Sequence, residues 1–101
     1  MKKLTEYFSH KEVLRDFNWS MLWELFDGNK SNLNISHECL DRHVEKGLAL
    51  RLKYADGRTE NHSFRELSDW TSRFANFLER HGIQAGDRVG VMLDPSLEFY
   101  T

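Results

Sequence analysis

Three side chains in the first half of the chain are of types that bind zinc: His37, Cys39 and His43. Cys39 and His43 are one helical turn apart, and thiolate and imidazole are both good zinc ligands. His37 projects away from that pair on a helix, however, and a structural zinc site needs four convergent ligands. The interpretation of these residues as a Cys/His nucleophile has even less support, because nothing indicates an orienting third group or an oxyanion hole. We therefore interpret Cys39 as a small buried thiol and assign no metal-binding or catalytic residue.

Glycines and one lysine suggest a phosphate-binding loop, but their spacing does not fit one. Gly82, Gly86 and Gly90 follow the pattern G-x3-G-x3-G and lie before or within a predicted strand, whereas a dinucleotide-binding loop follows a strand. A helix stop, a turn and a small strand residue explain them better. Lys30 lacks the G-x4-G-K-[ST] pattern of a phosphate loop. No cofactor-binding residue is assigned.

Two further groups of residues have types that bind substrates or partners. Asp41, Arg42 and His43 could position a substrate, but charged residues near a helix end more often form local ion pairs or caps. Asp41 and Arg42 are candidates for contacts with the rest of a larger domain. The tryptophans could form a binding platform, yet aromatic residues at helical spacing are usually core. We expect a core position for all three tryptophans, Trp19, Trp23 and Trp70. If the chain is truncated, Trp19 and Trp23 are the two most prone to exposure.

Composition limits the class of protein in which these residues lie. The 101 residues carry 14 basic and 16 acidic side chains, a net charge of -2, with no basic stripe for a nucleic acid. A hydrophobic fraction of 40% with 13% aromatic residues favours a single small globular domain over disorder. No apolar run is long enough for a signal peptide or a membrane span. One cysteine allows no internal disulfide, which fits the cytoplasm.

The first part of the chain is predicted to be helical. Ser9–Glu12 has the form of a capping box, in which hydroxyl and carboxylate each accept a free backbone N–H, and it opens a short helix. A second helical turn covers residues 21–26, with Asn18 or Ser20 as its cap.

A third helix is predicted over residues 35–44, because apolar residues recur there at helical spacing and Gly47 is well placed as a stop. With one proline, no repeat and no low-complexity tract, the chain contains no evident linker. We therefore divide it by periodicity into a helical N-terminal extension, residues 1–46, and the start of a second domain, residues 47–101.

The second domain should begin with a β-hairpin. Residues 48–54 alternate between apolar and polar types, and Asp56-Gly57 supplies two residues that tolerate the positive φ of a type I′ turn. A tight turn of that kind places Lys53 opposite Glu60 across the two strands.

An amphipathic helix should follow the hairpin. Ser63–Glu66 is a second capping box, and Gly82 ends the helix. The residues that fall on its apolar face are Phe64, Leu67, Trp70, Phe74, Phe77 and Leu78.

A buried strand and another helix should close the sequence. Arg88–Leu93 is an apolar run typical of a strand covered on both faces, and Asp94-Pro95 suits the start of a helix near Ser96. Such a strand needs neighbours, and an open edge invites pairing with another chain. We therefore expect a truncated chain that self-associates. The fold class is α+β to α/β: a helical N-terminal extension, a β-hairpin, an amphipathic helix and the first strand of a truncated domain.

The order and spacing of several short segments together resemble one family. These segments are Leu33–Ile35, Asp41–His43, Ser63–Leu67, Phe74–Leu78, Gly82-Ile83, Gly86–Val89 and Asp94–Tyr100. From about Asn18 onward the chain resembles the N-terminal segment of AMP-forming acyl-CoA synthetases, of the acetyl-CoA-synthetase type within the adenylate-forming superfamily. In that family such a segment builds the first layer of a large α/β adenylation domain.

The resemblance implies an acid–thiol ligase that uses ATP, Mg²⁺ and CoA in the intact enzyme. A carboxylate would attack ATP to give an acyl-adenylate and pyrophosphate, and the CoA thiol would then displace AMP. The family's Gly/Ser/Thr-rich phosphate loop and its C-terminal lysine have no counterpart in these 101 residues, so no site residue can be carried over. We expect the chain to be inert alone and to dock against the remainder of the parent synthetase.

Two questions remain open from the sequence. The acid can be acetate, a longer fatty acid of fatty acid metabolism or an aromatic acid. The alternative function is a free-standing protein-interaction module without catalytic activity, which would bind a protein partner through its aromatic N-terminal helices.

Overall fold

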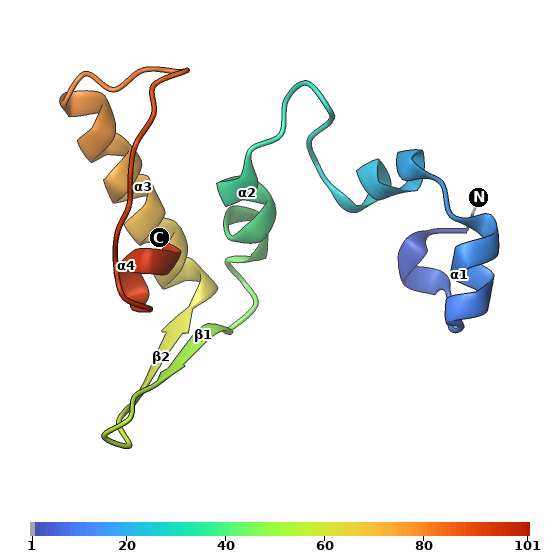
Figure 1. The fold of residues 1–101 in the computed structure, drawn as a ribbon, viewed down its shortest axis with the longest axis horizontal. Helices are drawn as coiled ribbons and strands as arrows, with labels where there is room; N and C mark the ends of the chain where they lie inside the picture. Colours follow the sequence, from blue (N-terminus) through green and yellow to red (C-terminus); the bar gives the residue numbers. More distant parts are fainter. Residues whose placement is uncertain (1) are drawn as a thin grey trace. The chain divides into compact units, whose positions relative to one another are not determined.

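The computed structural model describes residues 2–101, and the chain divides into two compact units (Figure 1). The first unit ends at Glu38 and the second comprises Cys39–Thr101. Within residues 2–101, no helix combines the length and the apolar character needed to cross a membrane.

Short helices make up the first unit. They are the 3₁₀ helix η1 (Leu4–Glu6), the α-helix α1 (His10–Asp16), the 3₁₀ helix η2 (Trp19–Leu25) and the start of α2 (Ile35–Cys39). η1 packs against η2, and Met21 on η2 is almost fully buried, with 1% of its surface exposed. This methionine is the centre of a very small core.

The caps of these helices confirm one prediction and correct another. The side-chain oxygen of Asn18 accepts the backbone N–H of Ser20 at 3.0 Å, so Asn18 is the predicted cap of the second helical turn. Ser9 is the N-cap of α1, but its hydroxyl makes no capping hydrogen bond, so the first capping box is absent. The Glu12 carboxylate instead lies 3.6 Å from the ammonium of Lys2, a competing partner.

The third predicted helix is interrupted. α2 ends at Cys39, Leu40 has φ -125° and ψ -62°, and a separate 3₁₀ helix, η3 (Asp41–His43), follows. The break coincides with a contact outside the segment, because the Ser68 hydroxyl donates to the Asp41 carboxylate at 2.6 Å. Helical periodicity alone does not reveal such a competing contact.

The predicted hairpin is present, but its turn and register differ from the prediction. β1 (Leu48–Lys53) pairs antiparallel with β2 (Thr59–Ser63), and Lys53 faces Thr59 rather than Glu60. Only Gly57 of the turn has positive φ, at +86°, so the turn is not of type I′. Backbone bonds from Gly57 to Tyr54 and from Tyr54 to Arg58 close a three-residue loop. The additional loop residue shifts the register by one.

The amphipathic helix is confirmed as α3 (Phe64–Arg80). The Ser63 hydroxyl accepts the backbone N–H of Glu66 at 3.1 Å, and Gly82, with φ +78°, follows the helix end. Leu67 is buried, with 4% exposed, and is the apolar centre of the second unit. Farther along the same face the aromatic residues are only partly covered.

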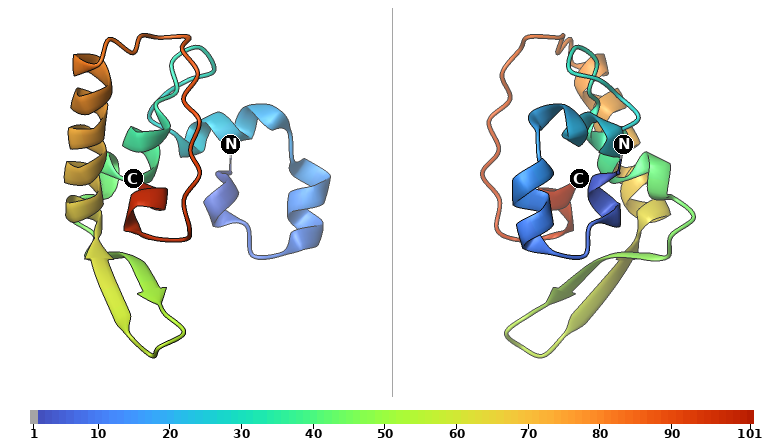
Figure 2. Two further views of the ribbon diagram at one scale, coloured as in Figure 1. Left: turned by 60° about the vertical axis from the view of Figure 1, so that its left-hand side comes forward. Right: turned by 90° about the vertical axis from the view of Figure 1, so that its right-hand side faces the viewer.

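The predicted strand over Arg88–Leu93 is absent. The segment is extended but irregular, and the only sheet within residues 2–101 is the two-stranded β1–β2 hairpin. A strand is defined by its hydrogen-bonded neighbours, and this segment has none in the part of the chain that the structure describes. The chain runs back alongside α3 to α4 (Leu97–Tyr100), whose N-cap is Ser96 (Figures 1 and 2). The structure is therefore an α+β arrangement without a parallel sheet.

Candidate functional site

A groove in the second unit is a candidate for a binding site. It has a volume of about 560 Å³ and lies between α3 and the returning segment. The residues that line it are Trp70, Arg73, Phe74, Val91, Leu93, Glu98, Phe99 and Thr101. Trp70 and Phe74 come from α3 and remain 44% and 42% exposed. The groove is therefore the incompletely covered apolar face of α3.

One basic and one acidic side chain are among the residues that line this groove. The Arg73 guanidinium lies 5.6 Å from the ring centre of Trp70, a cation–π distance. Hydrogen bonding from its own backbone N–H, and then from the Ser96 side chain, lowers the pKa of Glu98.

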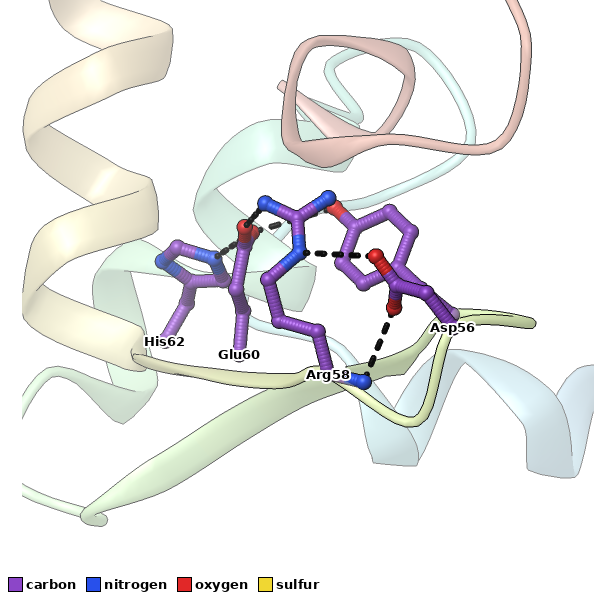
Figure 3. A network of polar contacts seen from close by, with 5 residues as sticks. Asp56, Arg58, Glu60 and His62 are labelled. Carbon is purple, nitrogen blue, oxygen red and sulfur yellow. Dashed lines mark hydrogen bonds and ion pairs between the residues drawn. The ribbon is translucent and has the colours of Figure 1, made fainter.

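A polar network on the hairpin includes His62, which contacts Glu60 on β2 (Figure 3) and also reaches Glu66 on α3. Its Nδ1 lies 2.9 Å from Glu66 Oε1, and its Nε2 lies 3.4 Å from Glu60 Oε2. The hydrogen bond with Glu66 is the largest cause that raises the pKa of His62, and Glu60 acts in the same direction. The imidazole side chain is only 12% exposed. Both ring nitrogens contact carboxylate oxygens, which leaves neither of them free to act as a general base.

The other members of the network hold Glu60 in place. Tyr54 donates its hydroxyl to Glu60 at 3.1 Å, and Arg58 donates to the other carboxylate oxygen at 3.1 Å. The Arg58 guanidinium also lies 4.1 Å from the ring centre of Tyr54 and pairs with Asp56 in the turn (Figure 3). Burial, followed by the hydrogen bond to Glu60, raises the pKa of Tyr54. The network fastens the hairpin tip and β2 to the start of α3.

Sequence reasoning missed this network, although part of its signal was present. Glu60 and His62 are two residues apart on a strand and therefore share a face, and His62 and Glu66 are four apart across the junction with α3. The alternation of β2 thus places one carboxylate beside the histidine. The capping-box interpretation assigned Glu66 to a backbone N–H, whereas its carboxylate contacts the imidazole.

The first unit contains a buried carboxylate that the sequence did not predict. Glu38, 7% exposed, accepts the backbone N–H of Asp27 at 3.1 Å and that of Gly28 at 2.7 Å. A Cβ at Gly28 would lie 2.5 Å from the Asn32 carbonyl oxygen, so only glycine fits there. Glu38 closes the Asp27–Asn34 loop onto α2, which is a structural role.

The three residues considered as zinc ligands have separate partners. His37 Nε2 lies 2.9 Å from Asp27 Oδ2, and the His43 ring packs edge-on against Phe64 with 5.6 Å between ring centres. Cys39 is exposed, so its interpretation as a buried thiol was wrong: α2 ends at this residue and leaves the thiol uncovered. Among residues 2–101, no group of three His, Cys, Asp or Glu side chains converges on a point suited to a metal.

The remaining predicted positions are structural or exposed. Asp41 holds Ser68, while Arg42 and Lys30 are exposed. Gly86 has φ +95° in a turn that the Asp87 carboxylate closes onto the Gln84 N–H at 2.7 Å, and Gly90 lies in the unpaired segment.

The expected core position was wrong for two tryptophans. Trp19 is 76% exposed and Trp70 is 44% exposed, whereas Trp23 is half-buried. The helical spacing placed their side chains on shared faces, but it did not show whether another element covers those faces.

Comparison with known proteins assigns a family to most of the chain. Residues 40–101 match the family described as AMP-binding enzyme. An acetyl-coenzyme A synthetase of Methylobacillus flagellatus is 39% identical over 90 residues, which is 86% of this chain and 13% of that protein. An acetyl-coenzyme A synthetase of Cupriavidus metallidurans is 43% identical over 70 residues, which is 65% of this chain and 11% of that protein. The chain thus spans about an eighth of the length of these relatives. No solved structure matches it.

Proposed function

The chain belongs to the AMP-binding enzyme family, and we propose that it is an N-terminal part of an AMP-forming acyl-CoA synthetase. The family match over residues 40–101 carries this proposal, and the likeness of 90 residues to an acetyl-coenzyme A synthetase supports it. The intact enzyme would join a carboxylic acid to CoA at the expense of ATP, through an acyl-adenylate. Acetate is the first acid to test, since it is the acid in the names of the relatives. The lone cysteine fits a cytosolic enzyme.

The part that this chain plays in such an enzyme is structural. Trp70, Phe74 and Phe77 on α3 are 44%, 42% and 52% exposed, which is a large apolar surface for one helix face. An amphipathic helix gains most of its stability from packing this face against another element. In the proposed function, the remainder of the parent synthetase supplies that cover.

The described residues are not a good fit to the cofactors of the intact enzyme. Magnesium prefers converging oxygen ligands, and no group of three candidate ligand residues converges within residues 2–101. The sequence also lacks a Ser/Thr/Gly-rich loop ending in lysine that would hold the phosphates of ATP. No catalytic step is therefore assigned to a residue of this chain, and we expect it to be inert by itself.

ATP–pyrophosphate exchange tests both parts of the proposal. The 101-residue chain, given ATP, Mg²⁺ and acetate or a longer acid, should produce no exchange above the buffer rate, and measurable exchange would overturn its inertness. The product of the full reading frame that contains this sequence, if the frame extends past Thr101, should exchange pyrophosphate with at least one acid. A full product that is folded but inactive with every acid would contradict the synthetase assignment.

The alternative function, a protein-interaction module, has one observation in its favour. Phe8 and Trp19 in the first unit are 97% and 76% exposed, as expected of side chains that enter a partner's pocket. The reading frame distinguishes the two functions. A frame that continues into a Gly/Ser/Thr-rich phosphate loop supports the synthetase, whereas a stop codon after Thr101 supports the module.

A further inference from the structure

The imidazole of His62 contacts a carboxylate through each of its nitrogens, and this sets the number of protons that the ring must carry. Nδ1 lies 2.9 Å from Glu66 Oε1 on α3, and Nε2 lies 3.4 Å from Glu60 Oε2 on β2. An ionised carboxylate accepts hydrogen bonds but donates none, so each contact needs an N–H from the ring. Only the charged imidazolium has an N–H on both nitrogens. The two contacts together therefore require the charged ring.

The surroundings of His62 favour this charged form. The titratable and charged groups around the ring come from β2, α3, α4 and the hairpin tip, and they are Glu60, Glu66, Glu98, Arg58 and Tyr54. On β1, the residue opposite His62 is the apolar Leu50. The Arg58 guanidinium bonds the Glu60 oxygen that does not contact His62. The hydrogen bond with Glu66 is the largest cause that raises the pKa of His62 above its usual 6.5, although burial opposes it.

Loss of one proton leaves the ring with a single N–H for two carboxylates, and the geometry decides which contact survives. The contact with Glu66, at 2.9 Å, is within the usual range of an N–H···O bond, whereas the contact with Glu60, at 3.4 Å, is long. Glu60 also keeps two other donors, the Tyr54 hydroxyl and the Arg58 guanidinium. The neutral ring should therefore keep its N–H on Nδ1 for Glu66. Its Nε2 lone pair then faces Glu60 and repels that carboxylate.

We propose that His62 is a proton-controlled switch that connects the hairpin tip, residues 54–58, to α3 through Glu60. With two protons the ring holds both carboxylates, and with one proton it holds Glu66 and releases Glu60. Glu60 lies between His62 and Arg58 and also bonds Tyr54, so its release disconnects the tip from the ring (Figure 3). The switch is closed at pH 6.5, and it opens as the pH rises through the raised pKa of His62. This inference does not depend on the proposed enzymatic activity.

The tautomer of the neutral ring is the most direct test. Nitrogen-15 NMR of protein labelled at histidine distinguishes an imidazolium from each of the two neutral tautomers, and the spectrum of His62→Gln assigns the His62 signals by difference. The sample is the product of the full reading frame that contains this sequence. Below its pKa, His62 should be the imidazolium, and above it the Nδ1–H tautomer, which is the less common form of neutral histidine in water. An Nε2–H tautomer above the pKa would overturn the proposal, because the ring would then have kept Glu60.

Amide hydrogen exchange of the hairpin, measured in the same protein, tests the release of the tip. The protection factors of a peptide covering residues 52–60, corrected for the intrinsic effect of pH on exchange, should fall about threefold as His62 loses its proton, a change of the size expected for a partly exposed ion pair. His81→Gln is the matched control. His81 is an exposed histidine of the same unit whose Nδ1 bonds the Phe77 carbonyl oxygen at 2.8 Å, so this variant should keep the fall.

Glu60→Gln distinguishes the proposed switch from a general effect of pH on the hairpin. A glutamine amide donates as well as accepts, so its N–H can bond the Nε2 lone pair of the neutral ring. This variant should protect residues 52–60 at high pH at least as well as at low pH. A fall in Glu60→Gln as large as that in the parent protein would overturn the proposal. So would constant protection of the parent protein while His62 titrates.

Discussion

Replacing Leu67 by alanine removes the side chain on which the second unit depends. Leu67 is 4% exposed and is the only apolar residue among the described part of that unit whose side chain is buried to this degree. Leucine-to-alanine changes at buried sites cost about 2–5 kcal/mol, through lost transfer free energy and the cavity that remains. A unit of 63 residues, Cys39–Thr101, has a total stability of roughly 3–9 kcal/mol at typical values per residue. The substitution should therefore remove about half of the free energy of unfolding or more.

Urea titration followed by tryptophan fluorescence measures this loss. Trp70 is the only tryptophan of the second unit, so a Trp19→Phe/Trp23→Phe background isolates its signal. Leu48→Ala is the matched control, because Leu48 lies in the same unit and is 51% exposed; it should cost less than about 1 kcal/mol. Equal losses for Leu67→Ala and Leu48→Ala, or a loss below about 1 kcal/mol at Leu67, would refute the assignment of the core.

Three further perturbations test the parts of the structure that position the hairpin and the loop. The contribution of His62 to the free energy of unfolding should be fully present below its unfolded pKa of 6.5 and should disappear as the pH rises through its raised folded pKa. In His62→Gln, the free energy of unfolding should not show this dependence on pH. Gly57→Ala should cost about 1–2 kcal/mol because its φ is +86°, whereas Gly90→Ala, with open space at Cβ and no positive φ, should be nearly neutral by the same urea assay. Glu38→Gln should cost about 1–3 kcal/mol, since an amide oxygen cannot replace both carboxylate acceptors; an equal loss in Glu45→Gln, at an exposed site, would contradict this reasoning.

Local signals in the sequence were sufficient for the elements that depend on local interactions. The apolar face and the Ser63 cap of α3, the glycine after it and the alternation of β1 all depend on residues within a few positions of one another. Asn18 is a similar case, because its cap bonds a backbone group two residues away. These predictions needed no knowledge of the rest of the chain.

Predictions failed where a distant partner or a single loop residue decided the outcome. The break at Leu40 accompanies the contact between Asp41 and Ser68, which are 27 positions apart. The hairpin register differs from the prediction because the loop contains three residues rather than two. An Asp-Gly pair is compatible with both loop lengths, so it did not distinguish them. The exposure of Trp70 and Cys39 depends on what covers them, which periodicity does not report.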